Sequence, residues 1–143
     1  LEIQTLPFPG FPTDLQAAFA VLMTQARGAS TLVERVFEDR LRYTDQLRAL
    51  GADVRVERSV ALDEDGQPIP GVVRYGNRAE FRGPATLRGG AVRCLDIRAG
   101  AGVVIAGLVA DGETIVSDTH HLARGYEAFV PKLQSLGARI TEA

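Results

Sequence analysis

One order of features occurs twice in this chain of 143 residues. Each copy has an aspartate before an apolar helical segment, then a glycine, a β-branched stretch, an arginine and the sequence Leu-x-x-Leu-Gly-Ala. The glycine and the arginine are 12 residues apart in both copies, at Gly28 and Arg40 and at Gly112 and Arg124. Because each copy of a repeat forms the same supersecondary unit, this order constrains the fold strongly. Alternating helices and strands predict an α/β protein in which sheets pack on helices.

We predict two units, at about residues 6–58 and 86–142, joined by a β-rich stretch at 59–85. The leading helix of the first unit follows Asp14, and that of the second follows Asp96. Both helices are apolar on most of their faces, which is typical of helices buried on all sides. We therefore expect helices inside and sheets outside.

The other elements follow from β-branched runs and from turn residues. In the joining stretch, Asp65-Gly66 is the turn signal of a hairpin. The last helix is expected to begin near residues 129–131, because proline is tolerated only in a first turn and Pro131 lies there. The expected strands lie at 30–36, 54–56, 79–82, 86–88, 91–94, 114–117 and 139–140.

The charge and cysteine content exclude several classes of protein. With 16 basic and 18 acidic residues the net charge is −2, which argues against a general nucleic-acid or membrane-surface binder. No apolar run approaches the ~18 residues that span a bilayer. A single cysteine, Cys94, excludes an internal disulfide and a multi-cysteine metal site. Cys94 lies in an apolar strand context, so core packing is favoured over a nucleophilic role.

Asp14 and Asp96 precede the two leading helices, and two interpretations are open for each. A helix cap is the common role of aspartate at such a position. The alternative is a general acid or base, or a ligand of a sugar hydroxyl. The sequence Pro9-Gly10-Phe11-Pro12-Thr13 favours the second interpretation for Asp14, since a rigid loop before the carboxylate suits catalysis.

Three arginines are candidates for an anion site, against the alternative that they are surface charges. Arg40 and Arg124 hold the same place in the two copies. Arg98 lies in the first turn of an apolar helix, where a cation is unfavourable to the helix dipole. We therefore expect Arg98 to have an anionic partner, either Asp96 or a bound phosphate or carboxylate.

Several of these segments resemble one family of enzymes. Residues 9–16 (PGFPTDLQ), 34–40 (ERVFEDR), 96–99 (DIRA) and 124–127 (RGYE) resemble signature stretches of the UDP-N-acetylglucosamine 1-carboxyvinyltransferases, which are enolpyruvyl transferases. The resemblance implies an inside-out α/β barrel of βαβαββ repeats with buried helices and outer sheets, present here as a partial domain. It also implies transfer of enolpyruvyl from phosphoenolpyruvate to UDP-N-acetylglucosamine with release of phosphate, in the first committed step of peptidoglycan synthesis, by a cytoplasmic enzyme without metal or organic cofactor.

The resemblance implies a role for each candidate residue. Asp14 would contact the attacking sugar hydroxyl and serve in proton transfer. Val36 and Phe37 would line the nucleotide-sugar site, and the three arginines would meet phosphate or carboxylate charge. The substrate-binding residues implied are Asp14, Val36, Phe37, Arg40, Asp96, Arg98 and Arg124.

The chain also departs from the family pattern. It aligns with about the carboxy-terminal third, so the amino-terminal lysine–asparagine pair and the loop with the reactive cysteine have no counterpart. The region 59–83 is longer than usual, and Ala123 replaces an aspartate that commonly precedes Arg-Gly-Tyr. We expect no turnover from these residues alone, a missing amino-terminal portion as partner, and an exposed apolar face where the barrel is incomplete. The alternative is a nucleotide-sugar-binding or partner-subunit module without catalysis of its own.

Overall fold

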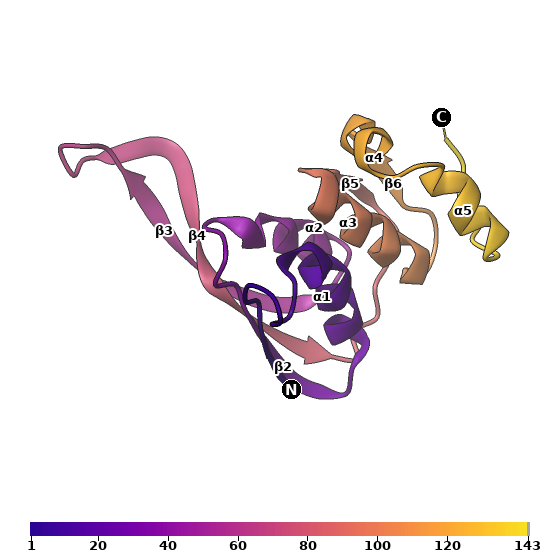
Figure 1. The fold of residues 1–143 in the computed structure, drawn as a ribbon, viewed down its shortest axis with the longest axis horizontal. Coiled ribbons are helices and arrows are strands. Elements are labelled where there is room, and N and C mark those ends of the chain that lie inside the picture. The colour runs from indigo at the N-terminus through magenta and orange to yellow at the C-terminus, as the bar shows by residue number, and fades with distance from the viewer. Residues whose placement is uncertain (143) are drawn as a thin grey trace.

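The computed structural model describes residues 1–142. These residues form two sheets and the helices that pack between them (Figure 1). The elements are β1 (Glu2–Gln4), η1 (Thr13–Leu15), α1 (Gln16–Gln25), β2 (Gly28–Val33), η2 (Arg40–Tyr43), α2 (Thr44–Ala49), β3 (Asp53–Leu62), β4 (Pro68–Gly83), β5 (Ala91–Arg93), α3 (Ile97–Val109), β6 (Ile115–Ser117), α4 (His120–Gly125) and α5 (Phe129–Ser135).

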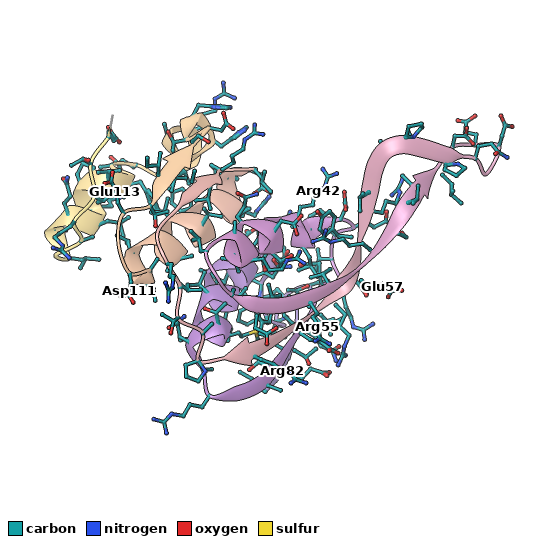
Figure 2. All side chains as sticks on the ribbon, turned by 180° about the vertical axis from the view of Figure 1, so that it is seen from behind. Arg42, Arg55, Glu57, Arg82, Asp111 and Glu113 are labelled. Atoms are coloured by element: carbon teal, nitrogen blue, oxygen red, sulfur yellow. The ribbon has the colours of Figure 1, made fainter. Side chains whose placement is uncertain are left out.

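The larger sheet has the strand order β1-β2-β4-β3. β1 and β2 are parallel, whereas β4 is antiparallel to both β2 and β3. Because side chains alternate along a strand, Phe81 and its cross-strand partner Val54 are buried on one face, together with Leu32 and Ala79. The opposite face is exposed and charged, as Arg55, Glu57 and Arg82 show in Figure 2.

Helices α1 and α3 lie side by side, and α1 packs on the inner face of the sheet (Figure 1). The close approach depends on Gly102, where an added Cβ would lie 2.9 Å from the Cβ of Ala17. Both helices are mostly buried, as expected. Four large apolar side chains of η1, α1 and α3 are exposed, which supports the expectation of an exposed apolar face. These are Leu15, Leu22, Leu108 and Val109.

The second sheet contains only the parallel strands β5 and β6. The expected helix begins at Phe129, so Pro131 lies in its first turn as predicted. The expected strand at 139–140 is wrong, because residues 138–142 form no strand. A strand needs a neighbour to satisfy its backbone groups, and no strand of the described chain pairs with this segment as β4 pairs with β3. The division into two units stays a prediction; a parallel strand pair in each half supports it.

β3 and β4 form one long hairpin whose turn end extends from the body as an arm (Figure 1), whereas residues 78–83 of β4 pair with β2 in the larger sheet. The hairpin expected around Asp65-Gly66 is present, but the separate strand expected at 79–82 is the end of β4, which runs without a break from Pro68 to Gly83. A bulge opposite Val56 and Arg58 bends the ladder without ending it. The expected strand at 86–88 is also wrong, since only an isolated bridge joins Arg88 to Asp111.

Candidate functional site

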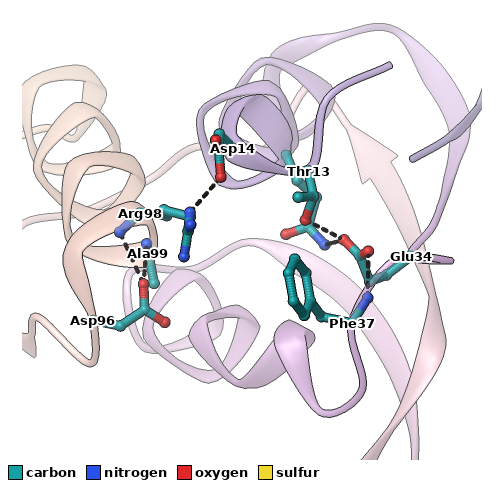
Figure 3. A network of polar contacts seen from close by, with 8 residues as sticks. Thr13, Asp14, Glu34, Phe37, Asp96, Arg98 and Ala99 are labelled. Carbon is teal, nitrogen blue, oxygen red and sulfur yellow. Dashed lines mark hydrogen bonds and ion pairs between the residues drawn. The ribbon is translucent and has the colours of Figure 1, made fainter. Parts of the chain in front are cut away.

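Asp14 lies in the short turn η1, where its side chain is free to meet another element. It does not cap a helix, because η1 precedes α1 and no side-chain cap is formed at either start. The capping interpretation is therefore wrong for Asp14. Its Oδ1 instead accepts a hydrogen bond from Nε of Arg98, 84 residues later in the sequence (Figure 3). The carboxylate side chain is 65% exposed and the guanidinium side chain 40%, so the pair is open to a ligand.

Asp96 is the cap of α3. Its Oδ1 accepts hydrogen bonds from the backbone N–H groups of Arg98 at 2.8 Å and Ala99 at 2.9 Å. These are two of the donors that the first turn of a helix leaves without partners. The anionic partner of the Arg98 side chain in the structure is accordingly Asp14 and not Asp96. Asp96 thus caps the start of α3, and Asp14 pairs with the arginine in the first turn of that helix.

Glu34 is a buried carboxylate that the sequence analysis did not single out. It follows β2 and is 2% exposed. Its Oε1 accepts hydrogen bonds from the Thr5 hydroxyl at 2.8 Å and from the backbone N–H groups of Val36 at 2.7 Å and Phe37 at 3.1 Å. Burial raises the pKa of Glu34, but these hydrogen bonds and one from Thr13 outweigh it and hold the pKa below its ordinary value.

The other oxygen of Glu34 reaches the turn that carries Asp14. Its Oε2 accepts hydrogen bonds from the hydroxyl of Thr13 and from Nε2 of Gln16, both at 2.8 Å (Figure 3). A single carboxylate therefore connects the two segments that flank the site. The sequence carries no local signal for this connection, because the donors Thr5, Thr13 and Gln16 are far from residue 34 along the chain.

Phe37 and Arg40 lie next to each other after the Glu34 loop. Phe37 is 49% exposed, although it is a large apolar residue, and the Arg40 guanidinium lies 4.5 Å from its ring centroid. The Nη1 atom of Arg40 is buried and has no hydrogen-bond partner within residues 1–142. A buried guanidinium N–H without a partner is costly, and an anionic ligand would satisfy it. Val36 is partly buried beside them.

Arg124 does not join this cluster. It lies exposed in the last turn of α4, and among residues 1–142 no ion pair or hydrogen bond connects its side chain to Asp14, Arg40 or Arg98. The neighbouring Ala123 offers no carboxylate to hold it. The structure therefore brings together Asp14, Arg98 and the loop of Val36 and Phe37, while Arg124 remains apart.

Two buried groups lie beneath the site. The Tyr43 hydroxyl has no hydrogen-bond partner in the described chain, and burial together with the carboxylates of Glu34 and Asp96 raises its pKa far above the ordinary value. Cys94 packs in the core, as expected, with its Sγ 3.3 Å from the carbonyl oxygen of Asp96. Burial raises the pKa of this thiol, which disfavours the reactive thiolate.

Neither a metal centre nor a membrane span is evident within residues 1–142. No three or more His, Cys, Asp or Glu side chains lie close enough to share a metal ion there. In the same range, every helix is too short or too polar to cross a bilayer.

Comparisons with known proteins agree with this architecture. The family model described as EPSP synthase (3-phosphoshikimate 1-carboxyvinyltransferase) matches residues 1–133. The enolpyruvyl transferase NikO from Streptomyces tendae is similar in structure, with a TM-score of 0.76 and 30% identity over 99% of this chain and 29% of that one. EPSP synthase from Acinetobacter baumannii shares the fold, with a TM-score of 0.62 at 17% identity over 92% of this chain and 27% of that one.

Curated relatives are similar over nearly the whole of this chain. A UDP-N-acetylglucosamine 1-carboxyvinyltransferase from Thermodesulfovibrio yellowstonii is 44% identical over 98% of the chain and 29% of the relative. One from Trichormus variabilis is 47% identical over 97% of the chain and 27% of the relative. The chain thus spans less than a third of the length of these relatives. The predicted inside-out α/β fold, present as part of a domain, is confirmed. The chain belongs to the EPSP synthase (3-phosphoshikimate 1-carboxyvinyltransferase) family.

Proposed function

We propose that this chain is the carboxy-terminal part of an enzyme that transfers enolpyruvyl from phosphoenolpyruvate to UDP-N-acetylglucosamine, the first committed step of peptidoglycan synthesis. The relatives that carry this activity in their names support the choice of substrates. The observation that carries the proposal is the open Asp14–Arg98 pair, which Glu34 connects to the loop of Val36 and Phe37. The guanidinium of Arg40, whose buried Nη1 has no partner in the described chain, packs on Phe37 in that loop.

The arrangement suits this chemistry. Asp14 accepts the proton of the attacking sugar hydroxyl, whose oxygen forms a bond to C2 of the enolpyruvyl group while the electrons of the C2=C3 double bond take up a proton at C3. Loss of that proton from C3 re-forms the double bond as the bond from C2 to the phosphate oxygen breaks, and phosphate leaves and takes up the proton held by Asp14. Arg40 and Arg98 bind the phosphate or carboxylate of phosphoenolpyruvate, for which guanidinium groups are well shaped. Phe37, half exposed, lines the nucleotide-sugar side with Val36.

Asp96, Arg124 and the missing amino-terminal portion have further roles in the proposed enzyme. Asp96 acts through the α3 end that it caps, and Arg124 binds substrate only if the remainder of the protein brings ligand to α4. The missing amino-terminal portion is the expected partner and supplies the other side of the site. The 143 residues alone are accordingly inactive.

The test is phosphate release by the complete gene product that contains these residues, supplied with both substrates. Asp14→Asn keeps the size of the side chain but not its basicity, so kcat is expected to fall by about 100-fold or more. Arg40→Ala is expected to raise the KM of phosphoenolpyruvate. The matched control is Arg93→Ala, which removes an exposed arginine paired with Asp118.

Two results would contradict the proposal. Phosphate release unchanged in Asp14→Asn would remove Asp14 from the reaction, and release by the isolated chain above background would refute its inactivity. A protein that binds UDP-N-acetylglucosamine through Asp14 but turns over no substrate would instead be the non-catalytic binding module.

A further inference from the structure

Glu34 connects the two segments of this chain to which the proposed function assigns contacts with the sugar nucleotide. Asp14 lies between Thr13 and Gln16 in sequence, and the side chains of both donate hydrogen bonds to Oε2 of Glu34. The backbone N–H groups of Val36 and Phe37 donate to Oε1. We propose that Glu34 is a positioning residue that fixes the Asp14 turn relative to the Val36–Phe37 loop. This inference rests on the proposed function, because the relative position of the two segments matters only if both contact the substrates.

The contacts of Glu34 fit a geometric role better than an electrostatic one. It is almost fully buried, yet no lysine, arginine or histidine among residues 1–142 forms an ion pair with it. Five neutral donors hold the charge instead, from Thr5, Thr13, Gln16, Val36 and Phe37. A buried ion held only by hydrogen bonds requires every donor to keep its place, because each loss leaves part of the charge unsolvated. The carboxylate therefore fixes two segments at once.

The groups that donate hydrogen bonds to Glu34 differ in whether they can also act as acceptors. A hydroxyl rotates and an amide side chain flips, so Thr13 and Gln16 can become acceptors. The backbone N–H groups of Val36 and Phe37 can only donate. In a Glu34→Gln variant, the glutamine oxygen must therefore face the loop and its NH2 group must face Thr13 and Gln16. The loop keeps an acceptor, whereas the hydrogen bonds to the turn that carries Asp14 are reversed and join neutral groups, so they hold the turn less firmly than a carboxylate does.

This asymmetry predicts a split between the kinetic constants of the complete gene product. Glu34→Gln is expected to lower kcat by about 10-fold to 100-fold, the range that misplacement of a reacting group produces, while the KM of UDP-N-acetylglucosamine changes less. Thr13→Val removes one contact to Oε2 without touching the carboxylate, and is expected to act in the same direction with a smaller effect. It also serves if Glu34→Gln does not fold.

The matched control is Thr24→Val, at the other end of α1. Thr24 is fully buried and its hydroxyl donates to the carbonyl oxygen of Val21 at 2.7 Å, so this variant loses a buried hydrogen bond remote from Asp14. All variants are compared at equal folded fraction, from their thermal unfolding curves. If kcat and KM of Glu34→Gln match those of Thr24→Val, the positioning role is refuted.

A second readout does not depend on activity. The N–H groups of Leu15 and Gln16 donate to the carbonyl oxygens of Pro12 and Thr13 within the Asp14 turn. Hydrogen exchange at these two amides is expected to accelerate about tenfold in Glu34→Gln and not in Thr24→Val, the factor for loss of one net hydrogen bond. Unchanged exchange would overturn the inference. If the wild-type protein releases no phosphate, the proposed function fails, and this exchange alone decides the role of Glu34.

Discussion

The contact between α1 and α3 at Gly102 can be tested by adding one methyl group. In Gly102→Ala the new Cβ would lie 2.9 Å from the Cβ and carbonyl carbon of Ala17 and 3.0 Å from its oxygen. Carbon atoms in ordinary contact are about 3.5–4.0 Å apart, so the helices must separate by several tenths of an ångström. Overpacking of this kind costs about 1–3 kcal/mol, while replacing glycine by alanine in a helix returns about 1 kcal/mol.

Gly107→Ala in the same helix provides the control. It gains the same helix propensity, but its Cβ meets the methyl group of the half-buried Thr114 at 3.0 Å, a side chain in a loop that can shift. Gly102→Ala is therefore expected to be about 1–3 kcal/mol less stable than Gly107→Ala, and its Tm lower by roughly 3–9 °C for a chain of this size. Urea and thermal unfolding followed by far-UV circular dichroism measure both values. Equal stabilities would show that the helices are not in close contact here.

The same substitution tests the geometry of the site. Ala17 lies one turn after Asp14, and Gly102 one turn after Arg98, so helix separation at this contact also separates the ion pair. An exposed pair couples by about 0.2–1 kcal/mol, which a double-mutant cycle of Asp14→Ala and Arg98→Ala measures. The coupling is expected to persist in a Gly107→Ala background and to vanish in a Gly102→Ala background. Persistence in both would refute the link between the helix contact and the site.

Three further outcomes follow from single groups. Asp96→Ala is expected to destabilise the protein by about 1 kcal/mol through loss of the α3 cap, with Asp96→Asn closer to wild type in the same unfolding assay. Because the pKa of Glu34 is lower in the folded protein than its ordinary value of about 4.3, its stabilising effect is complete above that value and is lost as the pH falls through the folded pKa, so Glu34→Gln should flatten the loss of unfolding free energy in acid. Cys94 is buried with a raised pKa, and a thiol reagent is expected to label it only as fast as the protein opens, with labelling in urea as the reference.

The sequence allowed most elements to be predicted because their signals are local. Asp96 and Gly112 lie at the two ends of the second apolar helix, and the structure has α3 between them. Pro131 limited the start of the last helix to its first turn, where α5 begins. Apolar residues on most faces indicated buried helices, and α1 and α3 are mostly buried. Each of these inferences needs only a few neighbouring residues.

The site required contacts that no local pattern encodes. Arg98 was expected to have an anionic partner, and Asp96 is two residues away, but Oδ1 of Asp96 accepts the backbone N–H groups of Arg98 and Ala99 and the Arg98 side chain pairs elsewhere. The partner, Asp14, comes from another element. Glu34 was missed for a similar reason, since its donors lie at positions 5, 13 and 16 as well as next to it. The absent strand at 139–140 likewise depends on a neighbour rather than on its own residues.

Under the proposed function, the pairing of Asp14 with Arg98 couples substrate binding to proton transfer. The Arg98 guanidinium is 40% exposed and paired with Asp14. The anionic groups of phosphoenolpyruvate therefore compete with Asp14 for this guanidinium, since carboxylates and phosphates are both suited to its hydrogen bonds. When the ligand takes Arg98, the Asp14 carboxylate is released to meet the sugar hydroxyl. Removal of the Asp14 charge, as in Asp14→Asn, should therefore strengthen phosphate binding while it lowers turnover.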